Sequence, residues 1–190
     1  VDLLSSTLEG AQSANYLIDF TGAPSTNANI DPFELSVNGS FTVHDKLYDG
    51  GTGAAINNNS LTLPDVISGD FVNLNAVANF DTKDVGVNKD VNILSSYLSG
   101  ADAGNYSLTF PPTTPTTTAS ISAIELSIGG DFVTESKIYD SETSANLITN
   151  NLTLNGVLGG ETVNLIDVEI DFEQATIGTS LLVSITNANI

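Results

Sequence analysis

The 190-residue sequence contains no cysteine, methionine, tryptophan or arginine. The absence of cysteine excludes disulfide bonds and thiolate zinc sites. Only four lysines oppose 23 acidic residues, which gives a formal net charge of −19. Binding to nucleic acid or to an anionic membrane surface needs clustered basic residues, so we expect neither partner. No apolar run approaches the roughly 18 residues that span a bilayer, so we expect no membrane insertion.

The sequence contains an internal repeat. The segment Phe41–Gly50 returns as Phe132–Ser141, and both copies share the pattern Lys-[Leu/Ile]-Tyr-Asp. The offset between Lys46 and Lys137 is 91 residues (137 − 46), and it becomes 92 between Phe80 and Phe172 (172 − 80). A repeat of this length is too long for a solenoid unit and has the size of a small domain.

The phase of the repeat predicts how the chain divides. Val1–Ser6 matches Val91–Ser96, and Gly10–Tyr16 matches Gly100–Tyr106, both at an offset of 90. We therefore expect the C-terminal part of one repeat in residues 1–30, a complete domain in 31–123 and the N-terminal part of the next repeat in 124–190. The alternative phase divides the chain into 1–90 and 91–190. Complementary ends predict head-to-tail self-association by strand addition, besides contacts between neighbouring repeats of the same chain.

The hydrophobic pattern predicts an all-β fold. Short alternating segments are broken every eight to twelve residues by glycine, asparagine, aspartate or proline. We predict tandem antiparallel β-sandwich domains of the immunoglobulin-like kind, with a β-grasp-like sheet as the alternative. The predicted strands of the complete copy are 34–43, 45–48, 60–63, 72–80, 90–98, 106–110 and 116–121. Those of the second copy are 125–134, 136–139, 152–154 and 163–172.

One local motif supports a sandwich. Residues 102–108 read Asp-Ala-Gly-Asn-Tyr-Ser-Leu. This pattern is similar to the tyrosine corner of immunoglobulin-type domains, in which the tyrosine hydroxyl bonds to backbone upstream. We therefore assign a structural role to Asp102, Gly104 and Tyr106.

A set of motifs carries a family resemblance. They are Lys-x-Tyr-Asp-Gly, then Gly-Asp-x-Val-x-Leu, then Asp-x-Gly, and finally Leu-Ser-Gly-Ala-Asp-Ala-Gly-Asn-Tyr-x-Leu. The residues concerned are Lys46, Tyr48, Asp49, Gly50, Gly69, Asp70, Asp84, Gly86, Leu98, Ser99, Gly100, Ala101, Asp102, Ala103, Gly104, Asn105 and Tyr106. On these residues the sequence resembles the YDG repeat domain of large bacterial adhesins that are filamentous and haemagglutinin-like. The resemblance implies an extracellular or cell-surface location and a β-rich stalk without chemistry of its own. The second copy departs from the pattern, since Ser141 replaces the glycine of Tyr-Asp-Gly.

We expect no enzyme and no catalytic residues. His44 is the only histidine, and no Gly-x-Ser-x-Gly nucleophile elbow is present. A calcium site is a weaker hypothesis, because calcium takes six to eight oxygen ligands. Its candidate ligands are Asp49, Asp70, Asp102, Asp140 and Glu161. The competing interpretation, which we favour, is that each carboxylate caps a local turn, and we therefore expect no cofactor.

The two repeated lysines allow two interpretations. Lys46 and Lys137 either form an amide cross-link with asparagine or aspartate, or pair with local carboxylates, which we favour. With Tyr48, Asp49, Tyr139 and Asp140 they make up a predicted structural motif. The predicted function is a stalk or extender that projects a distal binding region. The alternative is a module that binds glycan or a host or abiotic surface, with or without calcium.

Overall fold

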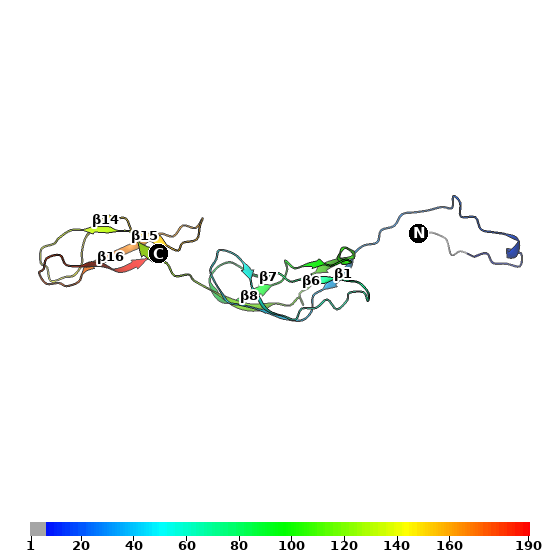
Figure 1. Cartoon of the computed structure of the whole chain (residues 1–190), viewed down its shortest axis with the longest axis horizontal. Coiled ribbons are helices and arrows are strands. Elements are labelled where there is room, and N and C mark those ends of the chain that lie inside the picture. Colours follow the sequence, from blue (N-terminus) through cyan, green and yellow to red (C-terminus); the bar gives the residue numbers. More distant parts are fainter. Residues whose placement is uncertain (1–6) are drawn as a thin grey trace. The chain divides into compact units, whose positions relative to one another are not determined.

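The computed structural model describes residues 7–190, and they form β-strands joined by turns (Figure 1). Within this range the only helical segments are two short 3-10 turns, η1 (Ser13–Asn15) and η2 (Ala103–Asn105). The predicted all-β class is therefore confirmed. The predicted match of Val1–Ser6 lies outside the described residues. No helix in residues 7–190 is long and apolar enough to cross a membrane.

The chain divides into two compact units, which we describe separately. Among the described residues, unit 1 comprises residues 7–38, 62–75 and 97–114, and unit 2 comprises residues 39–61, 76–96 and 115–190. Eight of the strand pairs in the described residues are antiparallel, as predicted. Two pairs are parallel and differ from that prediction, one in each unit. Parallel pairing joins strands far apart in the sequence, so local alternation does not reveal it.

Unit 1 is built around a parallel pair. Its strands are β1 (Phe33–Ser36), β6 (Asn73–Asn75), β9 (Tyr97–Ser99) and β10 (Tyr106–Thr109). β1 runs parallel to β10 with Leu35 opposite Leu108, and β6 pairs antiparallel with β9. Leu35 is 0% exposed, and the rings of Phe33 and Tyr106 meet edge to face with centroids 6.2 Å apart. The small core of unit 1 therefore lies where its first and last strands meet.

Unit 2 contains the largest sheet of the described chain. Its strands are β2 (Phe41–Val43), β3 (Lys46–Leu47), β4 (Gly53–Ala54), β5 (Ile56–Asn59), β7 (Ala78–Phe80), β8 (Gly86–Asn92), β11 (Thr117–Ser122), β12 (Ser127–Gly129), β13 (Phe132–Thr134), β14 (Leu147–Asn150), β15 (Thr153–Asn155), β16 (Ile166–Phe172) and β17 (Val183–Asn189). Five strands form one sheet in the order β3-β11-β8-β7-β4, and β7 and β8 are labelled side by side in Figure 1. The remaining strands pair two by two: β2 with β5, β12 with β15, β13 with β14 and β16 with β17.

β11 lies inside the five-stranded sheet and supplies much of its core. It pairs parallel with β3 and antiparallel with β8. Ile121 in β11 is 1% exposed, and Val91 in β8 and Phe80 in β7 are also buried. Full burial of such side chains is worth about 1.5–3 kcal/mol each, so the sheet depends on β11 remaining in place.

The long predicted strands are interrupted by turns. The segment predicted as 34–43 forms β1 and β2 with a break at Gly39, where φ is +99°. A Cβ at this position would lie 2.2 Å from the carbonyl oxygen of Ser60, so only glycine fits. Gly130 repeats the geometry, with φ +85° and a Cβ position 2.2 Å from the carbonyl oxygen of Asn151. The same glycine turn therefore divides the second predicted strand, 125–134, into β12 and β13.

Other sequence predictions were partly wrong at the level of single strands. Residues 136–139 form no strand, although 45–48 contains β3. β4, β5, β14 and β17 were absent from the predicted set, and 60–63 contributes only a bridge between Asn38 and Thr62. β4 and β5 consist mainly of glycine, alanine or asparagine, whose low intrinsic strand preference was overridden by long-range pairing.

Candidate functional site

The first Lys-x-Tyr-Asp motif folds into a hydrogen-bonded turn. Lys46 Nζ donates to Asp49 Oδ1 at 2.7 Å and to the Gly51 carbonyl oxygen at 2.8 Å. The Gly51 N–H donates to the same carboxylate oxygen at 2.9 Å. The ammonium also lies 5.6 Å from the centroid of the buried Phe80 ring, within cation–π range. Lys46 thus ties the turn to the core of the five-stranded sheet.

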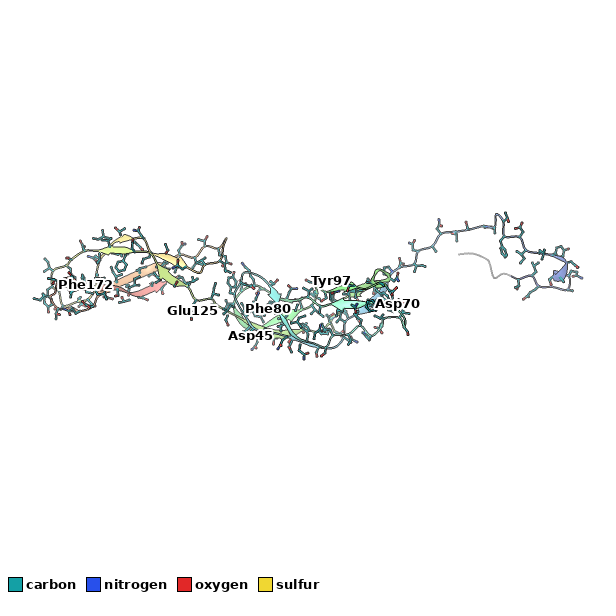
Figure 2. The ribbon with its side chains drawn as sticks, viewed as in Figure 1. Asp45, Asp70, Phe80, Tyr97, Glu125 and Phe172 are labelled. Atoms are coloured by element: carbon teal, nitrogen blue, oxygen red, sulfur yellow. The ribbon has the colours of Figure 1, made fainter. Side chains whose placement is uncertain are left out.

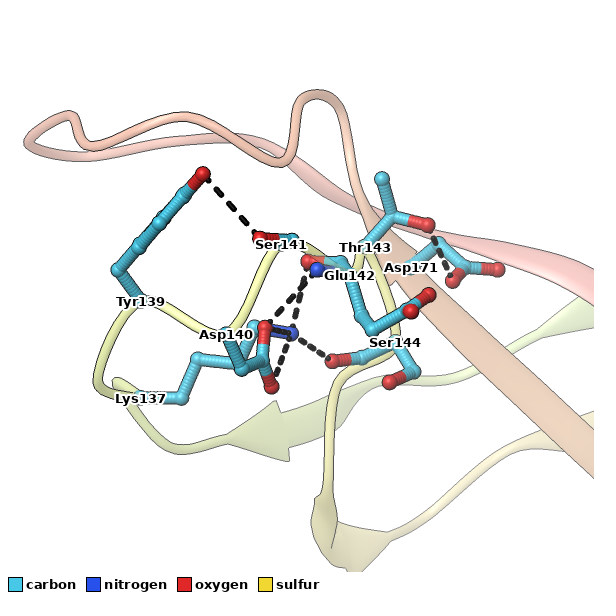
Figure 3. A network of polar contacts seen from close by, with 8 residues as sticks. All are labelled: Lys137, Tyr139, Asp140, Ser141, Glu142, Thr143, Ser144 and Asp171. Atoms are coloured by element: carbon cyan, nitrogen blue, oxygen red, sulfur yellow. Dashed lines mark hydrogen bonds and ion pairs between the residues drawn. The ribbon is translucent and has the colours of Figure 1, made fainter.

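The second motif makes the same turn, which Figure 3 shows from close by. Lys137 Nζ donates to the Glu142 and Ser144 carbonyl oxygens at 2.8 and 2.9 Å and lies 2.9 Å from Asp140 Oδ1. The Glu142 N–H donates to Asp140 Oδ1 at 3.0 Å, and the ammonium lies 5.8 Å from the Phe172 ring centroid. Each lysine is therefore held by an ion pair to the local aspartate.

These contacts shift the acidity of both aspartates in the same direction. The hydrogen bond from Lys46, with a further one from the Gly51 N–H, holds the pKa of Asp49 below its ordinary value. Lys137 and the Glu142 N–H lower the pKa of Asp140 in the same way. Both carboxylates are therefore charged, and both act as turn caps of the kind that aspartate often supplies.

The tyrosines of the two motifs have different partners. Tyr48 lies in unit 2, where its hydroxyl donates to Glu161 Oε1. Lys83 Nζ is 3.5 Å from the same oxygen and 5.9 Å from the Tyr48 ring centroid. The hydrogen bond to Glu161 raises the pKa of Tyr48. Tyr139 is exposed and accepts only a 3.2 Å bond from the Ser141 hydroxyl among the described residues.

Tyr106 anchors a second polar cluster, in unit 1, close to Asp70 (labelled in Figure 2). Its hydroxyl donates to Asp70 Oδ2 at 2.5 Å and accepts a 3.2 Å bond from the Ile67 N–H. Asp102 Oδ2 accepts from the Phe71 N–H at 2.8 Å. The bond to Asp70 raises the pKa of Tyr106. The hydroxyl thus reaches backbone upstream, as in a tyrosine corner, and adds a carboxylate partner.

The remaining predicted positions show no ligand geometry. Gly104 lies in η2, and a Cβ there would meet no atom within 4 Å, so nothing in the structure explains the glycine. Asp49 and Asp140 accept from donors of their own turns, as the turn-capping interpretation predicts. Asp70, Asp102 and Glu161 instead accept from donors that are 36, 31 and 113 residues away in the sequence, so that interpretation is wrong for them. Across residues 7–190 no group of three or more His, Cys, Asp or Glu side chains is arranged to hold a metal ion.

The sequence did not predict the aromatic rings beneath the two lysines. Phe80 and Phe172 stand 34 and 35 residues after the lysines they contact (80 − 46; 172 − 137). The available signal was their own recurrence in the repeat, at an offset of 92. The sequence also did not predict Ser96, a buried serine whose hydroxyl accepts a 3.0 Å bond from the Val77 N–H.

An open groove lies beside the second lysine turn. It has a volume of about 300 Å³ and is lined in part by Lys137, Phe172, Gly178, Leu181 and Val183. Its floor combines the lysine turn with strands β16 and β17.

The fold defines a β-rich chain in which the repeated Lys-x-Tyr-Asp motif forms two hydrogen-bonded turns. Comparison with protein families assigns part of it: residues 31–119 match the YDG domain, so this segment is a YDG domain. Searches of curated proteins and of solved structures gave no match.

Proposed function

We propose that this chain is a non-catalytic stalk segment of an extracellular bacterial adhesin of the filamentous, haemagglutinin-like kind. In this proposal residues 31–123 form one complete repeat, flanked by parts of its neighbours. Repeats of this kind project a distal binding region away from the cell surface. The YDG domain at 31–119 supports the assignment, as does the use of its motif residues for turns and core contacts.

The observation that carries the proposal is the parallel pairing of β1 with β10. β1 is the first strand of the YDG domain, and β10 is followed closely by its last strand, β11. Tension along the chain enters β1 at its N-terminal end, and the part of it that reaches β10 acts at the C-terminal end of β10, through the segment that leads to β11. In a parallel pair these pulls act in opposite directions along the strands, so the hydrogen bonds of all four register pairs share the load in shear.

The side chains at this pair resist sliding. Leu35 is fully buried, Tyr106 is buried with its hydroxyl bound to Asp70, and the Thr109 hydroxyl donates to the Leu35 carbonyl oxygen at 3.2 Å. Displacement along the strand breaks these contacts together with the ladder. The net charge of −19 adds repulsion between neighbouring stalks, within about a Debye length of 8 Å at physiological salt.

Single-molecule force spectroscopy tests the proposal. Because the chain has no cysteine, handles can be attached at Asp31→Cys and Thr113→Cys, just before β1 and just after β10, which load this pair in shear. The control places handles at Ser40→Cys and Ser60→Cys, at the open end of the antiparallel β2–β5 pair, where hydrogen bonds break one after another. We expect a clearly higher unfolding force in the first geometry.

Equal forces in the two geometries would contradict a load-bearing role. A glycan screen with the same chain separates the spacer from the alternative, a glycan- or surface-binding module. The spacer binds no glycan in that screen, with or without calcium, and saturable binding would support the module instead.

A further inference from the structure

Residues 7–31 have the local conformation of the segment that completes the fold. η1 repeats η2, because the Ser13 N–H donates to the Gly10 carbonyl oxygen as the Ala103 N–H donates to that of Gly100. Gly10 and Gly100 share a φ of +120°. Beyond them Tyr16 corresponds to Tyr106 at an offset of 90, and Ile30 to Ile121 at an offset of 91.

The burial of the two segments is opposite. Tyr106 and Ile121 are buried in their units, but Tyr16 is exposed and Ile30 is 100% exposed. Leu17, beside Tyr16, is 97% exposed. Residues 7–31 thus present apolar side chains that have buried counterparts elsewhere in the same chain. Exposed apolar side chains gathered in one segment mark an interaction site.

The groove beside Lys137 is lined by the residues that a strand equivalent to β11 would contact. In the complete domain β11 lies in register with Lys46 of β3 and with Gly86, Lys89 and Val91 of β8. Adding 91 to the first number and 92 to the others gives Lys137, Gly178, Leu181 and Val183. All four line the 300 Å³ groove.

A second segment of residues 124–190 also lacks the partner of its counterpart in the complete domain. β1 pairs with β10, and the residues that correspond to Phe33–Leu35 are Ile124–Leu126 (offset 91). Within residues 7–190 no strand pairs with 124–126, and Ile124 and Leu126 are only half-buried. Glu161 corresponds to Asp70, the carboxylate that receives the Tyr106 hydroxyl, and a carboxylate can accept that bond in addition to the bond from Tyr48.

We propose that residues 7–31 of one copy of this chain complete residues 124–190 of a second copy by strand addition. Thr26–Asp31 enter the groove beside Lys137 as β11 enters the five-stranded sheet. Tyr16–Asp19 pair in parallel with Ile124–Ser127, as β10 pairs with β1. The added strands form backbone hydrogen bonds, and the side chain of Ile30 is buried in the groove. Both contributions are typical of recognition by strand addition. The inference rests on the internal correspondence and does not depend on the mechanical role proposed above.

Charge limits the conditions under which two copies meet. Each chain carries a net charge of −19, so copies repel one another at low ionic strength. Salt of about 0.15 M shortens the Debye length to about 8 Å and weakens this repulsion. Association therefore strengthens as salt is raised, opposite to the behaviour of a contact held by ion pairs.

Sedimentation of the 190-residue chain over a range of concentrations tests the proposal. We expect the weight-average mass to rise from that of the monomer to that of the dimer and beyond. Ile30→Asp places a carboxylate in the groove and weakens association by about a hundredfold or more. Because Ile30 is fully exposed, this variant keeps its fold. The control Val87→Asp, at an 82% exposed position of β8, associates like the unmodified chain.

A cross-link tests the register. Ala28 corresponds to Ala119 and Leu181 to Lys89, which are partners across the antiparallel β11–β8 ladder. Partners in such a ladder lie about 4.5–5.5 Å apart at Cα, within disulfide range. Mixed Ala28→Cys and Leu181→Cys chains should form a covalent heterodimer on mild oxidation. Ala28→Cys mixed with Val87→Cys should not. A strictly monomeric chain, association unaffected by Ile30→Asp, or equal cross-linking in both mixtures would overturn the proposal.

Discussion

Replacing Ile121 by alanine gives the sharpest test of the part that β11 plays in the fold. Ile121 is 1% exposed and lies between β3 and β8, so the change removes three carbon atoms from a filled site. At about 0.8 kcal/mol for each buried methylene the transfer cost is about 2.4 kcal/mol. The cavity left behind adds to this, so we expect a loss of about 3–4 kcal/mol, inside the range known for such truncations.

The equivalent change at Ile30 is the matched control. Ile30 is fully exposed, and Ile30→Ala should change the free energy of unfolding by less than about 0.5 kcal/mol. Both variants are measured by urea unfolding at a concentration low enough to keep the chain monomeric. The milder Ile121→Val should cost about 1 kcal/mol, which lowers the melting temperature of a domain of this size by about 4–8 °C. A loss below about 1 kcal/mol for Ile121→Ala, or equal losses at both positions, would refute the assignment of β11 to the core.

Three further predictions concern the polar contacts. Asp49 and Asp140 have a lowered pKa in the folded state, so their contribution to stability is present above the unfolded value of 3.8 and is lost as pH falls through the folded pKa. The double variant Asp49→Asn/Asp140→Asn should therefore lose less stability than the unmodified chain below about pH 4, in acid titrations followed by circular dichroism. The same loss of stability in both chains would contradict this. The raised pKa of Tyr106 means that its contribution is present below about pH 10 and is lost as pH rises through the folded pKa. Tyr106→Phe should lower the urea midpoint of unfolding at pH 7 and reduce the loss of stability at alkaline pH. An unchanged midpoint would show that the Tyr106 hydroxyl does not stabilise the fold. Addition of calcium or of a chelator should leave the melting temperature unchanged. If Lys46 and Lys137 form ion pairs and no amide cross-link, the intact mass should equal the mass calculated from the sequence.

The local features of the fold could be predicted from the sequence because they depend on nearby residues. The alternating pattern predicts the all-β class, and the repeated Lys-x-Tyr-Asp motif marks two turns whose lysine and aspartate stand three residues apart. The tyrosine-corner pattern led to Tyr106, although its carboxylate partner Asp70 did not follow from it. These contacts are short in sequence or belong to a known motif.

Long-range pairing could not be predicted from the sequence. The parallel register of β1 with β10 joins residues 73 positions apart (Phe33 with Tyr106), and nothing in either strand specifies the other. The ring of Phe80 under Lys46 is fixed by the sheet order and not by local spacing. Strands such as β4 and β5 consist mainly of glycine, alanine or asparagine, which have low strand preference, and they exist because a partner strand is present.

Amide hydrogen exchange of the intact chain tests most directly the central claim, that the terminal strands of the YDG domain clamp it as a load-bearing unit. We expect the amides of β1, β10 and β11 to fall in the slowest-exchanging class, since strands that carry tension must open only with the whole domain. Residues 7–30 of the monomer should exchange rapidly by comparison. Fast exchange in β1 and β10, at rates like those of residues 7–30, would show that these strands open on their own and would contradict the account.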